Sequence, residues 1–151
     1  MEKAKKSLGQ HFLIDKNIRN KIIKILKLNK KKILEIGPGT GFLTDAILNE
    51  KPEKIILIEK DKKLFKKLYL KYKSNKKIKL YNKDFLDIDL SKFNNYIIIS
   101  NLPYNITKKF LYKLIFNNIH INESVVMIQK EVAKKINPKE KGMNKYIFLI
   151  N

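Results

Sequence analysis

Three glycines stand at alternate positions, Gly37, Gly39 and Gly41, directly behind a short apolar run that contains Glu35. Glycine lets a backbone turn sharply and approach a bound molecule without interference from a Cβ atom. The dinucleotide-binding pattern G-x-G-x-x-G would need glycine where Phe42 stands, and no Gly-Lys-Ser/Thr follows, so a P-loop is excluded too. The glycines therefore predict a ligand-binding turn of another kind; a purely structural turn is the alternative.

Two carboxylates follow the next two β-rich runs. Glu59 ends the run after the glycines and can accept hydrogen bonds from both hydroxyls of a ribose. Asp84 lies just beyond the third run and can accept from an adenine amine while Phe85 or a neighbour packs on the ring, although a loop cap is an equal alternative. G-x-G-x-G behind Glu35 is the form that S-adenosylmethionine-dependent methyltransferases use. Together the three features predict a site for S-adenosylmethionine.

Asn101-Leu102-Pro103-Tyr104 follows a strongly apolar run and has the residue types needed to modify an adenine amine. That amine is a poor nucleophile because its lone pair is delocalised into the ring. The Asn101 side-chain carbonyl and the Leu102 backbone carbonyl can each accept one amine hydrogen, which directs the lone pair at a methyl group. Pro103 would stiffen the turn, and Tyr104 would offer a ring on which an extruded base can stack. The alternative is a turn that simply breaks structure.

The chain contains no cysteine and only two histidines, His11 and His120. Disulfide frameworks, zinc fingers, iron–sulfur clusters and thiol nucleophiles are thereby excluded, and so is a multi-histidine metal site. Methyl transfer to an amine needs none of them, because the amine proton can leave after transfer and the reaction depends on positioning. We expect no metal.

Short β-branched runs alternate with longer helical patterns, and each candidate residue stands at the end of a run. Strands are expected over 33–36, 54–59, 77–81, 95–100 and 124–129, and helices over 42–49, from Asp61 through Tyr72, over 106–117 and from Lys130. An earlier helix would be capped by Asp15. Apolar strands that alternate with helices predict a parallel sheet covered on both faces, with ligands beyond the carboxyl ends of the strands. The expected fold is α/β and Rossmann-like.

Lysine and arginine number 34 against 14 acidic residues, a formal net charge of +20. Every basic residue except Arg19 is a lysine, as an AT-biased genome would produce. That bias explains the preference for lysine but not the excess over acids. We therefore favour a polyanion partner, nucleic acid first, bound through phosphates without sequence discrimination. Compositional drift is the alternative.

The 151 residues fit a single domain, 1–151, with an N-terminal segment and helix over 1–31 and a Rossmann-like core over 32–151. No run approaches the ~20 apolar residues of a membrane helix. The apolar triplet at 12–14 is too short for a secretory signal. We expect a cytoplasmic protein, monomeric in solution.

Taken together, the motifs resemble those of the ribosomal RNA adenine dimethyltransferase family, from residue 5 to about residue 150. The resemblance rests on residues 6–13 (KSLGQHFL), 34–41 (LEIGPGTG), 58–61 (IEKD), 101–106 (NLPYNI) and 127–133 (MIQKEVA). The tetrad at 101–104 is also similar to the Asn/Asp-Pro-Pro-Tyr motif of amino-methyltransferases. Leu102 favours the housekeeping branch over the antibiotic-resistance methylases, which usually have isoleucine there.

The resemblance implies transfer of two methyl groups from S-adenosylmethionine to each of two adjacent adenosines near the 3′ end of small-subunit ribosomal RNA. The partner would be a precursor of the small ribosomal subunit. Cofactor contacts would fall to His11, Leu13, Gly37, Gly39, Glu59, Asp84 and Asn101. Glu59 would hold the ribose and Asp84 the adenine, and Asn101 would lie between the cofactor and the target amine.

Chains of the family normally continue well beyond residue 151, with an antiparallel hairpin that completes the sheet and a small helical domain that helps to hold RNA. Here residues 142–151 match the family only loosely. Without the remainder, the sheet is expected to present an unpaired edge. A truncated product, a fragment and a minimal enzyme all fit, so cofactor binding follows more directly from these residues than turnover does.

Two other functions fit the same residues. One is an RNA-binding ribosome-assembly factor that keeps the fold but methylates poorly; its binding to the small subunit would persist without S-adenosylmethionine and without the Asn101 side chain. The other is an antibiotic-resistance methylase, which would act on large-subunit ribosomal RNA alone.

Overall fold

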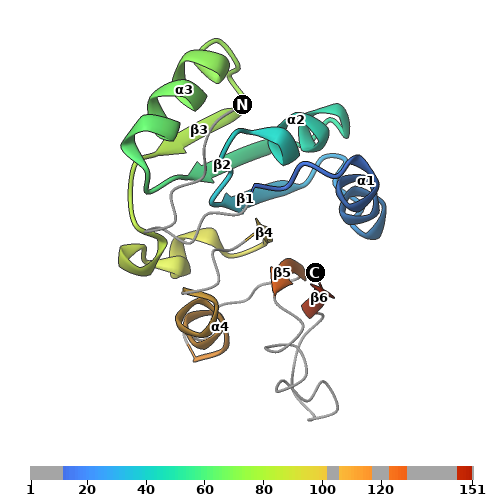
Figure 1. Cartoon of the computed structure of the whole chain (residues 1–151), viewed down its shortest axis with the longest axis vertical. Coiled ribbons are helices and arrows are strands. Elements are labelled where there is room, and N and C mark those ends of the chain that lie inside the picture. The colour runs from blue at the N-terminus through green and yellow to red at the C-terminus, as the bar shows by residue number, and fades with distance from the viewer. Residues whose placement is uncertain (1–11, 102–105, 117–122, 129–145, 151) are drawn as a thin grey trace.

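The computed structural model describes residues 12–101, 106–116, 123–128 and 146–150, with the backbone alone for 115–116 and 146–150. Six strands form one sheet in the order β3-β2-β1-β4-β5-β6, and every neighbouring pair is parallel (Figure 1). The strands are β1 (Lys32–Ile36), β2 (Lys54–Ile58), β3 (Ile78–Tyr81), β4 (Tyr96–Asn101), β5 (Glu123–Ile128) and β6 (Tyr146–Ile150). The α/β, Rossmann-like fold predicted from the sequence is confirmed.

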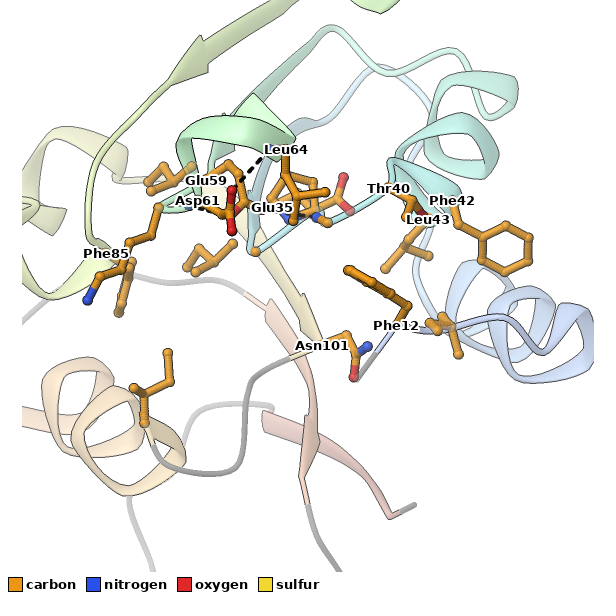
Figure 2. A pocket seen from close by; sticks show the side chains of 18 of the residues that line it. Phe12, Glu35, Thr40, Phe42, Leu43, Glu59, Asp61, Leu64, Phe85 and Asn101 are labelled. Atoms are coloured by element: carbon orange, nitrogen blue, oxygen red, sulfur yellow. Dashed lines mark hydrogen bonds between the residues drawn. The ribbon is translucent and has the colours of Figure 1, made fainter. Parts of the chain in front are cut away.

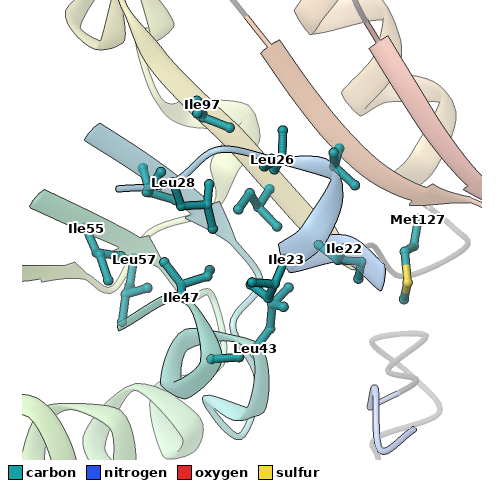
Figure 3. Packing of buried hydrophobic residues seen from close by; sticks show 14 of the residues in the cluster. Ile22, Ile23, Leu26, Leu28, Leu43, Ile47, Ile55, Leu57, Ile97 and Met127 are labelled. Atoms are coloured by element: carbon teal, nitrogen blue, oxygen red, sulfur yellow. The ribbon is translucent and has the colours of Figure 1, made fainter. Parts of the chain in front are cut away.

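Helices cover both faces of this sheet. They are α1 (Lys16–Ile25), α2 (Phe42–Asn49), α3 (Lys62–Tyr72) and α4 (Thr107–Phe116), with two 3-10 turns, η2 (Phe85–Asp87) and η3 (Leu90–Phe93). Apolar side chains of α1, α2 and α3 pack with alternate strand residues such as Ile33 and Ile97 (Figure 3). The other strand residues, such as Leu34 and Ile98, pack with α4 and the 3-10 turns. Each central strand is therefore buried on both sides, as its uninterrupted apolar sequence requires.

Two of the helices begin where the sequence predicts. The Asp15 carboxylate accepts from the backbone N–H groups of Asn17 and Ile18, at 2.6 and 3.2 Å. Asp61 caps α3 in the same way, through the N–H groups of Lys63 and Leu64 at 2.8 and 3.2 Å. Each carboxylate satisfies backbone donors that have no partner inside the helix.

The sheet continues beyond β5 with a strand that the sequence did not predict, and among the described residues this strand has a neighbour on one side only. Residues 146–150 form β6, which pairs with β5 in parallel, with Val126 opposite Phe148. The run Tyr-Ile-Phe-Leu-Ile has the β-branched and aromatic content of a buried strand, but the sequence analysis treated it only as a loose family match. The helix expected from Lys130 lies outside the described residues.

Within the part of the chain that the structure describes, no helix is both long and apolar enough to span a membrane.

Candidate active site

The order of the strands creates the site. The chain runs outward from β1 through β2 to β3, and then returns to place β4 on the other side of β1. The chain therefore continues from β1 to β2 on one side of this pair of strands and from β4 to β5 on the other, which opens a crevice at the carboxyl ends of β1 and β4. A pocket occupies this place and is lined by the segment before α1, the glycine turn, the loops after β2 and β3, and the end of β4 (Figure 2).

Every predicted site residue that the structure describes lines this one pocket: Leu13, Gly37, Gly39, Glu59, Asp84 and Asn101. These residues are far apart in sequence, but the parallel register brings them together because Ile36 lies opposite both Ile58 and Ser100. The residue that follows each of these strand positions then emerges at the same edge. His11 and residues 102–104, with Leu102, Pro103 and Tyr104, lie outside the described residues.

The glycine turn needs its glycines for different reasons. All three have positive φ, 67° at Gly37, 60° at Gly39 and 81° at Gly41, a conformation that disfavours other residues. A Cβ atom at Gly41 would lie 2.5 Å from the Tyr72 hydroxyl oxygen, so this glycine is also required for packing. A Cβ atom at Gly37 would approach nothing closer than the Asn101 carbonyl oxygen at 4.0 Å. The turn is thus open toward the pocket at Gly37.

Glu59 fastens the glycine turn to the loop after β2. One carboxylate oxygen accepts from the Asp61 N–H at 2.8 Å, and the other accepts from the Gly39 N–H at 3.1 Å. The residue is 6% exposed. Burial raises the pKa of Glu59, and the hydrogen bonds from Asp61 and Gly39 oppose that rise. Each oxygen keeps a further lone pair, so the carboxylate is a fixed double acceptor of the kind that suits a diol.

Glu35 lies deeper, beneath the glycine turn. The Thr44 hydroxyl donates to its carboxyl group at 2.7 Å. Burial raises the pKa of Glu35 to about 8, although the hydrogen bond from Thr44 lowers it. At neutral pH the side chain therefore holds its proton and acts as a neutral hydrogen-bonding group. From the sequence Glu35 is recognisable only as part of the motif, and its protonation follows from burial that sequence does not reveal.

Asp84 acts as a local cap, one of its two predicted alternatives. Its carboxylate accepts from the Leu86 N–H at 3.0 Å at the start of η2 and forms an ion pair with Lys60. Partial burial raises the pKa of Asp84, but the hydrogen bonds from Lys60 and Leu86 outweigh it, so the pKa lies below its usual value. Asp84 also lines the pocket, so capping does not remove it from contact with a ligand.

Asn101 ends β4 beside the glycine turn. The Ser100 hydroxyl donates to the Ile36 carbonyl oxygen at 2.7 Å, which ties this end of β4 to β1. Figure 2 shows the Asn101 side chain at the pocket, on the other side from Glu59. A ligand held by Glu59 and a second molecule held by Asn101 would therefore meet inside the pocket.

Two aromatic rings in the pocket have contacts that the sequence does not reveal. Phe12 covers the glycine turn, since a Cβ atom at Gly39 would lie 3.1 Å from its ring. In the sequence it was noted only as part of an apolar triplet. Phe85, which was expected to pack on a bound adenine, lines the pocket but also packs against Phe110, with ring centroids 4.8 Å apart and the rings tilted by 38°. Both contacts join segments that are remote in sequence.

The sequences of known proteins place the chain in a family. The model of the family described as "Ribosomal RNA adenine dimethylase" matches residues 1–146. The ribosomal RNA small subunit methyltransferase A of Pelagibacter ubique (strain HTCC1062) is 45% identical over 139 residues, which cover 89% of this chain and 52% of the relative. Its counterpart in Metamycoplasma arthritidis (strain 158L3-1) is 38% identical over 150 residues, 98% of this chain and 57% of the relative. The chain thus spans about half the length of the curated relatives it matches.

Solved structures agree with this assignment. A dimethyladenosine transferase from Plasmodium falciparum superposes with a TM-score of 0.72 at 30% identity, over 83% of this chain and 46% of the other. The 23S rRNA methyltransferase ErmE superposes with a TM-score of 0.73 at 27% identity, over 83% of this chain and 50% of the other. The match to the family model over nearly all of the sequence shows that the chain belongs to the ribosomal RNA adenine dimethylase family.

Proposed function

We propose that this protein uses S-adenosylmethionine to dimethylate two adjacent adenosines near the 3′ end of small-subunit ribosomal RNA, in the precursor of the small ribosomal subunit. The observation that carries the proposal is the meeting of Asn101, the glycine turn and Glu59 at one pocket, in a chain of this family. The named small-subunit relatives favour the small-subunit RNA over the large-subunit RNA on which ErmE acts.

The residues of the pocket fit the cofactor. The Glu59 carboxylate is fixed by two backbone N–H groups and offers both oxygens to the ribose hydroxyls. The turn is open at Gly37, where backbone can approach a ligand closely. Asp84 would accept from the adenine amine, and Leu13, together with His11, would close the pocket from the N-terminal segment. When bound, S-adenosylmethionine supplies an electrophilic methyl group on a sulfonium.

Asn101 and the three residues after it would hold the target. The Asn101 side-chain carbonyl and the Leu102 backbone carbonyl accept the two hydrogens of the adenine amine, which leaves its lone pair directed at the methyl group. Pro103 stiffens the turn and Tyr104 stacks on the extruded base. The amine proton leaves to solvent after transfer, so no side chain with a tuned pKa is needed and the rate depends on alignment.

The location and assembly of the protein belong to the same proposal. We propose a cytoplasmic monomer without a metal ion, whose lysines contact RNA phosphates.

The test combines two measurements on the same protein. Binding of S-adenosylmethionine is followed by calorimetry, and transfer of its labelled methyl group is followed on small subunits that lack the adenine methylation, with the product nucleosides identified. Dimethyladenosine as product supports the proposal. Cofactor binding without transfer, from folded protein, overturns it in favour of an RNA-binding assembly factor, and transfer to large-subunit RNA alone supports a resistance methylase.

Asn101→Ala refines this test. The variant loses an acceptor for the amine but keeps Glu59 and the glycine turn, so we expect methyl transfer to be lost while cofactor binding is largely retained. Glu59→Ala is the matched variant, for which cofactor binding itself is expected to fail. Undiminished transfer by Asn101→Ala would refute the role proposed for this side chain.

A further inference from the structure

Helix α3 carries charge of one sign only. Between residues 62 and 73 there are six lysines and no acidic residue: Lys62, Lys63, Lys66, Lys67, Lys71 and Lys73. Two of them stand in the first turn, where the helix dipole disfavours positive charge. Lysines four residues apart, such as Lys62 and Lys66, repel each other on the helix surface. This arrangement weakens an isolated helix, so the stability of α3 does not account for it.

The two flanks of α3 have different surroundings. Leu64, Leu68 and Tyr72 are buried against the sheet. On the flank toward α2, the Tyr72 hydroxyl donates to Asp45 at 2.7 Å and Lys71 forms an ion pair with the same carboxylate. The helical period of 3.6 places Phe65 and Tyr69 on the opposite flank, which faces β3 at the edge of the sheet.

Five residues on this flank and the adjoining outer side of the helix form a surface, which we call the α3 face and define as Lys62, Phe65, Lys66, Tyr69 and Lys73; Phe65 is half-buried and the other four are exposed. In the described part of the chain, none of its three lysines forms an ion pair with an acidic side chain. Within the described residues they therefore have no counter-charge from an ion pair. A polyanion would supply one, and displacement of its own counterions would favour the contact.

Aromatic side chains lie among these lysines. Phe65 and Tyr69 are stacked, with ring centroids 6.3 Å apart and an interplanar angle of 21°. Tyr69 is 54% exposed, so one side of this stacked pair is open to solvent. An exposed ring flanked by lysines is the arrangement that binds single-stranded nucleic acid, because bases stack on the ring while phosphates contact the cations.

We propose that the α3 face binds a single-stranded segment of RNA, with phosphates on Lys62, Lys66 and Lys73 and a base on Tyr69. This rests on the proposed function for the identity of the RNA. The face spans about 16 Å along the helix, enough for several nucleotides. It begins directly after Asp61, which lines the pocket, so the bound segment would belong to the same RNA molecule as the target adenine.

The lysines are tested by the salt dependence of RNA binding. The probe is a fluorescein-labelled single-stranded RNA of about 12 nucleotides, titrated with the full chain between about 50 and 200 mM salt. Changing Lys62, Lys66 and Lys73 together to Gln is expected to reduce the slope of log affinity against log salt by about 2, since each phosphate contact on a single strand contributes about 0.7.

The matched control removes the same charge elsewhere. Lys27 and Lys31 precede β1 and Lys54 is the first residue of β2, so these three exposed lysines lie toward the amino ends of the strands, opposite the pocket. Changing all three to Gln is expected to leave the slope within about 0.5 of the unaltered chain. An equal reduction by both triple variants would mean that binding follows overall charge, and no reduction by the α3 variant would mean that RNA lies elsewhere. Either result overturns the proposal.

Tyr69 separates stacking from charge. Tyr69→Ser is expected to weaken binding of the single strand by about 5- to 150-fold without changing the salt slope, whereas Tyr69→Phe keeps the ring and retains the affinity. Binding of the same sequence as a duplex, whose bases are already stacked, is expected to change little. Equal single-strand affinity for Tyr69→Ser and the unaltered chain would overturn the stacking role, since an exposed side chain leaves the fold intact.

These outcomes are independent of methyl transfer. If transfer fails but the α3 variants lose affinity as expected, the proposed reaction is wrong and the RNA surface stands. If dimethyladenosine forms while both triple variants bind RNA alike, the reaction stands and the surface is wrong.

Discussion

The pKa of a carboxyl group is raised in one part of the pocket, which we call the wall, and lowered in another part, which we call the rim. The wall, which we define as Glu35 and Glu59, is buried, and burial raises both pKa values. The rim, defined as Lys60 and Asp84, is open to water, with side chains 61% and 21% exposed, and the pKa of Asp84 is lowered. Glu59 and Lys60 are neighbours in sequence. Glu59 is thus a fixed hydrogen-bond acceptor shielded from water, whereas Lys60, one residue further from the end of β2, is a solvated charge.

The largest expected effect comes from Glu35→Gln and depends on pH. The pKa of Glu35 is about 8 in the folded protein and 4.5 as a model value, so the protonated form stabilises the fold fully below pH 4.5 and this stabilisation is lost as the pH rises toward 8. Glutamine has no such dependence. The unfolding free energy of Glu35→Gln relative to the unaltered chain should therefore rise by roughly 1.4 kcal/mol per pH unit across that window.

Urea unfolding of both chains between pH 4 and 8.5 measures this difference. Titrations of groups that do not interact with Glu35 are common to the two chains and cancel. A difference that stays constant with pH would show that Glu35 is ionised in the fold, which would remove the contrast between wall and rim.

Glu59→Ala is expected to have the next largest effect. The change leaves the N–H groups of Gly39 and Asp61 without their acceptor, and each unsatisfied buried donor costs about 1–3 kcal/mol. We expect a loss of about 2–4 kcal/mol in unfolding free energy, together with loss of S-adenosylmethionine binding. Glu59→Gln keeps one acceptor oxygen and should lose about half as much stability. Calorimetry and urea unfolding give the two readouts, and an Ala variant that binds the cofactor normally would contradict the assigned role.

The glycine turn offers a comparison between two of its own residues. Gly41→Ala combines a positive φ with a Cβ atom 2.5 Å from the Tyr72 hydroxyl oxygen, whereas Gly37→Ala has the positive φ but open space. Backbone strain alone costs about 1–2 kcal/mol, and the clash at Gly41 adds to it. Thermal unfolding should rank Gly41→Ala below Gly37→Ala. Cofactor affinity should fall more for Gly37→Ala when both are measured at a temperature where each is folded; the reverse ranking of stability would exclude the clash.

The sequence could predict which residues meet at one pocket because strand ends are set by local patterns. Glu59, Asp84 and Asn101 each follow an apolar run, and parallel pairing brings such positions to one edge whatever the details of packing. The sequence could not predict contacts between remote segments, such as Phe12 over Gly39 or Tyr72 against Gly41. For the same reason it did not distinguish a protonated Glu35 from an ionised Asp84. The β6 strand was missed although its apolar run is visible, because that run was weighed only as a loose match to the family and not as a strand.

The smallest effect is expected at the rim. Asp84→Asn removes the ion pair with Lys60, and since that lysine is 61% exposed, solvent screens the pair and its contribution is about 0.5–1 kcal/mol. The stability that Asp84 contributes changes with pH in the opposite direction to the stability that Glu35 contributes. Because the pKa of Asp84 is lowered in the fold, its stabilisation is present above the model value of 3.8 and is lost as the pH falls through the folded pKa. Asp84→Asn should therefore be less stable than the unaltered chain at pH 7 and converge with it at acidic pH, where Glu35→Gln converges too.

Lys60→Met reports on the same pair from the other side, and it should remove most of the pH dependence that Asp84 contributes. Two carboxylates of one pocket would then show opposite slopes of stability against pH, and parallel slopes would mean that burial, rather than local partners, governs both.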